Sequence, residues 1–272
     1  MPTDHAVFAR LSKDLDHGPL VVAHRGDSRN HPENTLAAFR AAAALGVPMQ
    51  EFDVQATRDG ALVCLHDAAF DRTTDSAARI GPGALVAHCT LAEAQALDAG
   101  SWFDAAHRGE RVPTLANALR VMLPGGVPLI EHKGGDPAAY VECLRGLGVA
   151  TDCILQSFDW AFVRRAHELA PELGLAVLGP TPAFPHPVAA ALAKAIECGA
   201  RMLHWHAKAL GRADVARIHA AGLLVCSYTT DDELGWTGGA GLGIDAMCTN
   251  DPAGMLRVRA SGVWRHLRPG NP

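Results

Sequence analysis

The sequence predicts an α/β fold, a TIM (β/α)8 barrel with an elaborated βα loop at its C-terminal mouth. Short apolar runs alternate with Ala- and Leu-rich helical patterns along the 272 residues. These runs are continuously apolar, which is typical of parallel strands buried on both faces. An open doubly wound sheet is the alternative, but no Gly-rich nucleotide-binding motif follows the first strand.

Each predicted strand is one of these short apolar runs, and eight of them fit one barrel. The predicted strands are Leu20–His24, Met49–Val54, Val127–Lys133, Cys153–Gln156, Leu175–Leu178, Arg201–Trp205, Leu223–Tyr228 and Asp245–Thr249.

The helical patterns lie between these strands. Asn34 and Asp136 are the expected N-caps of the helices that follow them. The predicted helices are Thr35–Leu45, Pro137–Leu147, Trp160–Leu169, Val188–Cys198, Arg212–Ala220 and Pro252–Ala260. Glycines at the expected helix ends are Gly46, Gly148, Gly174, Gly199 and Gly222.

The segment from Ala61 to Thr114 interrupts the alternation. A short extra strand is expected in ALVCLHD, after a turn at Asp59-Gly60. The rest is too short and too thin in core residues to form a second domain. We therefore expect residues 1–272 to form one barrel domain, with a core of about residues 20–255.

The composition of the chain argues against several classes of function. Apolar residues make up 49% of the chain, and the formal net charge is −5 with no basic stripe, which argues against nucleic-acid binding. No apolar run is long enough to span a bilayer, and MPTDHAVFARLSKDLDHG lacks the apolar stretch of a signal peptide. The seven cysteines include no C-x-x-C pair, and the four that lie in apolar runs, Cys64, Cys153, Cys226 and Cys248, are expected to be free, buried thiols. A cytoplasmic location is therefore predicted; the oligomeric state is not.

Several predicted strands end in charged residues, as in VVAHR, QEFD and PLIEHK. Glu51 and Asp53 lie two apart on one strand and share a face, and Glu131 ends another strand. Three converging carboxylates suit a hard divalent cation, Mg²⁺ or Ca²⁺. Ion pairs of these carboxylates with Arg25 and Lys133 are the alternative, and spacing alone leaves both open.

Two histidines are candidates for acid–base chemistry. His24 ends an apolar strand, and His66 lies in a His-Asp pair. Imidazoles on two sides of a metal-bound phosphodiester can serve as base and acid. His132 should face the helices, because its neighbours Glu131 and Lys133 share the opposite face. His204 and His206 share a face, but no third metal ligand is evident near them.

The order of short motifs resembles that of the glycerophosphodiester phosphodiesterase family. The resemblance covers about Leu20 to Met255, and the combined order and spacing are specific although each fragment is modest. The matching fragments are His24-Arg25-Gly26, Pro32-Glu33-Asn34-Thr35, Glu51-x-Asp53, Thr57-x-Asp59-Gly60, His66-Asp67, Arg72-Thr73-Thr74, LDAGSWF, Val112-Pro113-Thr114-Leu115, Glu131-x-Lys133, Gln156-Ser157-Phe158 and Thr249-Asn250-Asp251-Pro252.

The resemblance implies a barrel enzyme, a phosphoric diester hydrolase that converts small glycerophosphodiesters to glycerol 3-phosphate and an alcohol. It implies one divalent cation, Mg²⁺ or Ca²⁺, on Glu51, Asp53 and Glu131. It implies acid–base work by His24 and His66, and phosphate binding by Arg25 and Lys133. In this scheme His24 deprotonates water or the substrate's own hydroxyl and His66 protonates the leaving oxygen, although the reverse assignment is open.

The chain departs from the family pattern at a few positions. His132 replaces an apolar residue, Tyr228-Thr229 replaces a Trp-Thr pair, and Asn250 stands where an Asp is common. These departures are not expected to touch the metal ligands, but they border the mouth. Gln156, Trp205 and Tyr228 are candidate substrate contacts, of which Trp205 and Tyr228 can equally be wall packing.

Two other functions stay open. A related barrel enzyme of the sphingomyelinase-D or lysophospholipase-D kind would use the same metal and histidines on lipid phosphodiesters. It would need an exposed apolar rim, for which residues 80–88 are a weak candidate. A non-catalytic phosphodiester-binding protein is less consistent, because every proposed ligand and acid–base residue is present.

Overall fold

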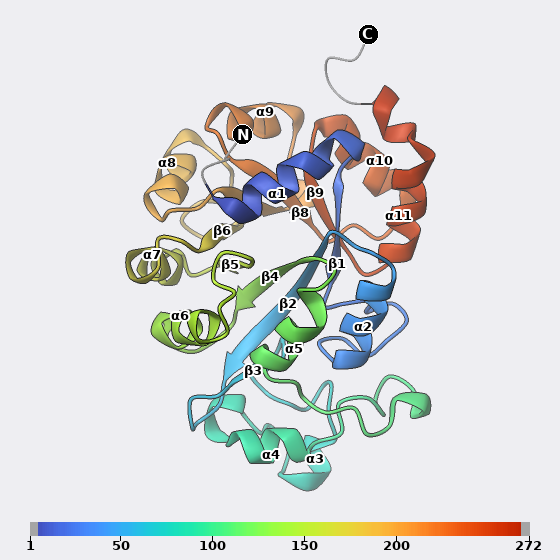
Figure 1. Cartoon of the computed structure of the whole chain (residues 1–272), viewed down its shortest axis with the longest axis vertical. Coiled ribbons are helices and arrows are strands. Elements are labelled where there is room, and N and C mark those ends of the chain that lie inside the picture. Colours follow the sequence, from blue (N-terminus) through green and yellow to red (C-terminus); the bar gives the residue numbers. More distant parts are fainter. Residues whose placement is uncertain (1–4, 268–272) are drawn as a thin grey trace.

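The computed structural model describes residues 5–267. Its central sheet is a closed barrel of eight parallel strands in the order β1-β9-β8-β7-β6-β5-β4-β2, closed by pairing of β1 with β2 (Figure 1). This confirms the predicted (β/α)8 barrel. The barrel strands are β1 (Leu20–His24), β2 (Met49–Ala56), β4 (Val127–His132), β5 (Ile154–Ser157), β6 (Gly174–Gly179), β7 (Met202–His206), β8 (Leu224–Tyr228) and β9 (Ala246–Thr249).

Every predicted strand is present, with boundaries shifted by at most two residues. The extra strand is also confirmed: β3 (Leu62–Cys64) pairs antiparallel with the end of β2. Gly174 begins β6 and does not end a helix, so that expectation was wrong. A Cβ on Gly174 would lie 2.6 Å from a methyl group of Val7, so glycine allows close packing at the end of the barrel where the strands begin.

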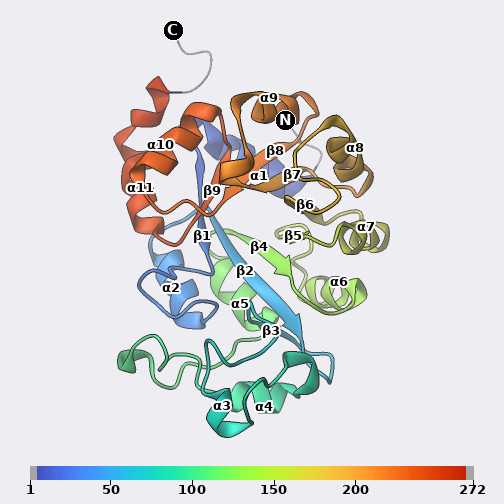
Figure 2. The ribbon, with the colours of Figure 1, turned by 180° about the vertical axis from the view of Figure 1, so that it is seen from behind.

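Helices surround the barrel on all sides (Figures 1 and 2). The predicted ones are α2 (Leu36–Ala44), α6 (Pro137–Gly146), α7 (Trp160–Leu169), α8 (Ala189–Glu197), α9 (Arg212–Ala220) and α11 (Pro252–Ser261). Outside residues 61–114, the helices that the patterns did not predict are α1 (Ala6–Asp14), α5 (Leu115–Met122) and α10 (Glu233–Leu242).

The N-cap of α2 differs from the prediction. Thr35, not Asn34, caps the helix by accepting a hydrogen bond from the amide of Ala38. Asn34 has a left-handed backbone with φ of 57°, which turns its side chain toward β2. The predicted cap of α6 is confirmed, because Asp136 accepts a hydrogen bond from Ala138.

Helix α1 closes the end of the barrel where the strands begin. Its buried residues Val7, Phe8 and Leu11 pack in one cluster with Leu20 and Val22, which point into the barrel. In Figure 1 this helix lies across the front of the barrel, and in Figure 2 it lies behind the strands. The mouth formed by the strand ends therefore stays free of α1.

The ladder register places polar residues of neighbouring strands side by side near that mouth. His24 of β1 pairs with Glu51 of β2, Asp53 of β2 pairs with Glu131 of β4, and Glu131 pairs with Gln156 of β5. Between these polar residues and the end where the strands begin, the barrel interior is apolar. The parallel register therefore assembles the site from separate strands.

The segment between β2 and α5 lies beside one end of the barrel (Figure 1). It contains β3, α3 (Ser76–Arg79) and α4 (Leu91–Ala96). It has more core than the sequence suggested, because a separate cluster of buried side chains fills it. These are Val63, Leu65, Phe70, Val86, Cys89, Ala94, Leu97, Ala99 and Val112.

The predictions for the chain ends and the cysteines were tested in part. Residues 1–4 and 268–272 lie outside the described residues, so the N-terminal stretch examined for a signal peptide is seen only in part. Trp264 is buried against Gly18. Cys64, Cys153, Cys226 and Cys248 are free and buried, as predicted. Within residues 5–267, no helix has the length and apolar content to cross a bilayer.

Candidate active site

A cavity of about 230 Å³ opens at the ends of the barrel strands. It brings together seven predicted site residues from β1, β2, β4, β8 and the segments that follow β1, β3 and β4. Its lining consists of His24, Arg25, Glu51, His66, Glu131, Lys133, Phe158, Leu178, His204, Tyr228, Thr229 and Cys248.

A buried cluster of three carboxylates lies at one side of this cavity. Oxygen atoms of Glu51, Asp53 and Glu131 all lie within 4.8 Å of one another. Asn34 fixes Asp53 twice: its amide donates to Oδ2 at 2.9 Å, and its carbonyl oxygen accepts from the backbone amide at 3.2 Å. Asn34 was part of a quoted motif but had no predicted site role.

The three carboxyl groups of the cluster differ in the direction in which their pKa is shifted. Burial, together with the nearby charges of Asp53 and Glu131, raises the pKa of Glu51 well above its usual value. Burial and Asp53 likewise raise the pKa of Glu131 to about 7. Burial also acts on Asp53, but Arg25 and Lys133 outweigh it and lower the pKa of that carboxyl.

Both alternatives left by the spacing have a basis in the geometry. Arg25 Nε lies 3.1 Å from Asp53 Oδ2, and Lys133 Nζ lies 2.5 Å from Glu131 Oε1, so the ion pairs form. Three carboxylates against these two cations still leave one negative charge when all are ionised. Glu51 Oε1 is buried without a hydrogen-bond partner among residues 5–267. This orphaned oxygen in an all-oxygen cluster fits a hard divalent cation.

His24 is oriented by a neutral amide. Its Nδ1 lies 2.7 Å from Oδ1 of Asn250, whose Nδ2 donates to Asp231 at 2.7 Å. Because that contact turns the amide oxygen toward His24, Nδ1 carries the hydrogen and Nε2 carries a lone pair. Burial, then Arg25, lowers the pKa of His24, so the ring stays neutral near neutral pH.

His66 is oriented by a carboxylate instead. Its Nδ1 hydrogen-bonds Asp67. Asp67 also accepts from Arg72, which holds Glu33 through two further bonds of 2.8 Å. Arg72 lowers the pKa of Asp67 to about 2, so His66 faces a fixed negative charge. Glu33 in turn accepts from Arg25 at 2.8 Å, which links the His66 side to the carboxylate cluster.

The three remaining predicted site residues, Tyr228, Trp205 and Gln156, differ in whether they reach the cavity. Tyr228 lines the cavity, but its hydroxyl donates to the carbonyl of Gly179 at 2.8 Å. Trp205 is fully buried in the outer core against Gly179 and does not reach the cavity, so its predicted substrate contact was wrong and wall packing is correct. Gln156 is fully buried and hydrogen-bonds His204, so it can act on a substrate only through that residue.

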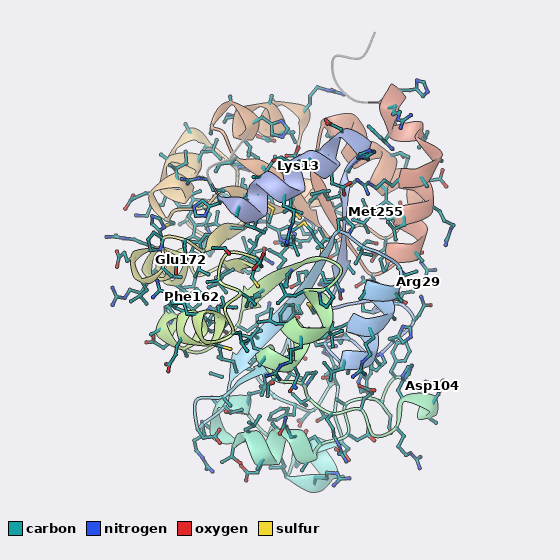
Figure 3. All side chains as sticks on the ribbon, in the orientation of Figure 1. Lys13, Arg29, Asp104, Phe162, Glu172 and Met255 are labelled. Carbon is teal, nitrogen blue, oxygen red and sulfur yellow. The ribbon has the colours of Figure 1, made fainter. Side chains whose placement is uncertain are left out.

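His132 faces the helices, as predicted. Its ring stacks on Phe162 of α7 with centroids 3.6 Å apart (Figure 3 labels Phe162). Among residues 5–267, neither His204 nor His206 belongs to a group of three potential metal ligands, in agreement with the missing third ligand.

Sequence reasoning missed the residues that orient the histidines. Asn250 was noted only as a departure at the mouth, yet it contacts His24. Asp67 and Arg72 lay in quoted motifs without a role. The available signal was their proximity in sequence to His66, whereas Asp231 carried no signal.

Known proteins of similar sequence and fold identify the family of this chain. The model of the glycerophosphoryl diester phosphodiesterase family matches residues 24–254. A glycerophosphodiester phosphodiesterase of Bacillus subtilis is 32% identical over 261 residues, which cover 88% of this chain and 86% of that protein. A phosphodiesterase of Oleispira antarctica, solved with the product sn-glycerol-3-phosphate, has a TM-score of 0.80 at 30% identity and covers 88% of this chain and 96% of its own.

A second solved structure, a glycerophosphodiester phosphodiesterase from Agrobacterium tumefaciens, has a TM-score of 0.75 at 26% identity. It covers 88% of this chain and 99% of its own. Fold and site therefore define a barrel enzyme of the phosphoric diester hydrolase class. Within that class, the chain belongs to the glycerophosphoryl diester phosphodiesterase family.

Proposed function

We propose that the protein hydrolyses small glycerophosphodiesters to glycerol 3-phosphate and an alcohol, with one divalent cation and two histidines. The observation that carries the proposal is the meeting of a carboxylate cluster and two differently oriented imidazoles in one cavity. The product found in the Oleispira antarctica relative supports the substrate class.

Glu51, Asp53 and Glu131 would hold the cation, which can be Mg²⁺ or Ca²⁺ because both prefer oxygen ligands. When bound, such a cation offsets negative charge that develops on a phosphate oxygen. Arg25 and Lys133 line the same cavity and would bind the phosphate. Both keep their charge there, because neighbouring carboxylates outweigh burial and raise the pKa of each.

The partners of the two histidines support His24 as the base and His66 as the acid. His24 is neutral and carries its lone pair on Nε2, so it can take a proton from the nucleophile. The nucleophile is water or the substrate's own hydroxyl; in the second case the alcohol leaves from a cyclic glycerophosphate, which water then opens to glycerol 3-phosphate. His66 is held in position by its hydrogen bond to the carboxylate of Asp67, which suits a ring that passes a proton to the leaving oxygen.

The lipid-acting alternative gains no support from the relatives, whose names specify glycerophosphodiesters. Ile80 and Leu85 in the candidate rim are partly exposed, but neither lines the cavity. A single domain over residues 1–272 and a cytoplasmic location stay predictions of the sequence.

Phosphorus NMR tests the proposal directly. Glycerophosphocholine and glycerophosphoethanolamine are incubated with the protein in Mg²⁺, in Ca²⁺ and in EDTA. We expect glycerol 3-phosphate to appear with at least one cation and not with EDTA. Absence of turnover by folded, cation-loaded protein on both substrates would contradict the proposal.

A further inference from the structure

His204 is a polar residue that the reaction scheme above does not use. It points into the barrel from β7, is 2% exposed, and lines the same cavity as the catalytic candidates. The other two histidines of the cavity wall are His24 on β1 and His66 in the segment after β3. A buried polar side chain at a cavity wall needs a hydrogen-bond partner, because leaving it unpaired costs free energy.

The hydrogen bond of His204 determines its tautomer. Nδ1 lies 2.8 Å from Oε1 of Gln156 on β5. An amide oxygen only accepts, so Nδ1 carries the hydrogen and Nε2 carries a lone pair. Nε2 is buried and has no hydrogen-bond partner among residues 5–267. Burial, and then the nearby His24, outweighs the opposing effect of the Ser227 backbone and lowers the pKa of His204 to about 3, which keeps the ring neutral.

The surroundings define the group that Nε2 can bind. Leu178 and Tyr228 line the wall around His204, and the Tyr228 ring meets its imidazole edge-on at 5.2 Å between centroids. The Tyr228 hydroxyl is already bound to Gly179, so it does not satisfy Nε2. Beside Leu178 and the Tyr228 ring, a neutral acceptor selects a neutral donor, which in a phosphodiester substrate is an alcohol hydroxyl.

We propose that Nε2 of His204 accepts a hydrogen bond from a hydroxyl group of the substrate's glycerol moiety, with Gln156 holding the ring in position. This inference rests on the proposed function. It makes His204 a specificity-determining residue and Gln156 a positioning residue. The head group then lies outward, toward Phe158, which is 42% exposed at the same cavity. Choline carries no hydroxyl once esterified, so it cannot provide this hydrogen bond.

The test compares glycerophosphocholine with its two mono-deoxy analogues, each lacking one glycerol hydroxyl. For the unmodified protein, we expect kcat/KM to fall at least about tenfold for one analogue, because the buried Nε2 loses its donor. In His204→Phe, which removes the acceptor and keeps a ring, that preference should shrink to less than about threefold. His204→Gln, which restores an acceptor, should recover part of it.

His206→Phe is the matched control, because His206 lies two residues further on the same strand and does not line the cavity. It should keep the tenfold preference. Equal use of both analogues by the unmodified protein, or a preference that survives in His204→Phe, would overturn the inference. So would an equal loss of preference in both phenylalanine variants.

If His204→Phe does not fold, Gln156→Leu decides instead, because it frees the imidazole tautomer and should also reduce the preference. A preference unchanged in folded Gln156→Leu would remove the positioning role, and the unmodified protein's analogue data would still test His204. If the unmodified protein hydrolyses none of the three diesters, the proposed function fails, which is a different result from hydrolysis without preference.

Discussion

Nδ1 of His24 lies 2.7 Å from the amide oxygen of Asn250. His66, which lines the same cavity, has the carboxylate of Asp67 as the partner of its Nδ1. An amide does not stabilise an imidazolium, whereas a carboxylate does. This difference is the basis of our proposal that His24 is the base and His66 the acid.

Replacing Asn250 with aspartate tests the role of the amide. In Asn250→Asp the new carboxylate favours protonated His24, so the pKa of His24 rises from its lowered value. Because the base must be neutral, the acidic limb of the kcat/KM profile should move to higher pH by roughly one unit. A pH–rate series measures this, and an acidic limb that stays in place or moves to lower pH would refute the assignment.

The two histidines should differ in their dependence on the leaving group. General acid–base catalysis contributes about 10²- to 10⁴-fold. His66→Ala should lose this factor on glycerophosphocholine but little on a glycerophosphodiester with a 4-nitrophenol leaving group, which needs no protonation. His24→Ala should lose it on both substrates. The opposite pattern would reverse the base and acid, and losses that do not depend on the leaving group would remove the assignment.

Glu131 should destabilise the metal-free protein at neutral pH. Burial, then Asp53, raises its folded pKa to about 7 from 4.5. Because the folded state binds this proton more tightly than the unfolded state, the carboxyl favours folding while it is protonated in both states. That contribution to stability is lost as the pH rises from about 4.5 to about 7. Glu131→Gln should therefore gain on the order of 1–3 kcal/mol in unfolding free energy relative to the unmodified protein across this window.

Urea unfolding at several pH values in EDTA measures this difference. Glu168→Gln, a change at an exposed helical position, is the control and should show no comparable trend. If Glu131→Gln gains no unfolding free energy, or if its gain falls as the pH rises, then burial does not raise the pKa of Glu131 in the folded protein.

A divalent cation should stabilise the folded protein through the carboxylate cluster. At a free concentration 100 times Kd, one site adds about 2.7 kcal/mol, which corresponds to several degrees in Tm for a chain of this size. Glu51→Gln should lose most of this shift with Mg²⁺ or Ca²⁺. Thermal unfolding with and without each cation measures it, and an equal shift in Glu51→Gln would place the cation elsewhere.

The barrel and its carboxylates were predictable because they follow from local periodicity. Continuous apolar runs marked the strands, and spacing of two placed Glu51 and Asp53 on one face. The same rule explains the error at Trp205: it directly follows His204, which faces the cavity, so it must face outward.

Other features depend on residues far apart in the sequence or on unfavourable local signals. The contact of His24 with Asn250 joins the first and last barrel strands, and no local pattern predicts it. Helix α10 was missed because Gly235, Gly238, Gly239 and Gly241 lie in its ten residues, and glycine lowers helix propensity. Its other contacts override that propensity: Trp236 is buried, and Asp232 caps the helix.

The most direct test of the central claim is a cation titration of the reaction itself. The protein is stripped with EDTA, desalted and given glycerophosphocholine, and phosphorus NMR follows glycerol 3-phosphate as Mg²⁺ or Ca²⁺ is added back. We expect no product before addition and a rate that saturates at one bound cation per chain, with Asp53→Asn inactive throughout. Full activity in the stripped protein, or an active Asp53→Asn variant, would contradict the account.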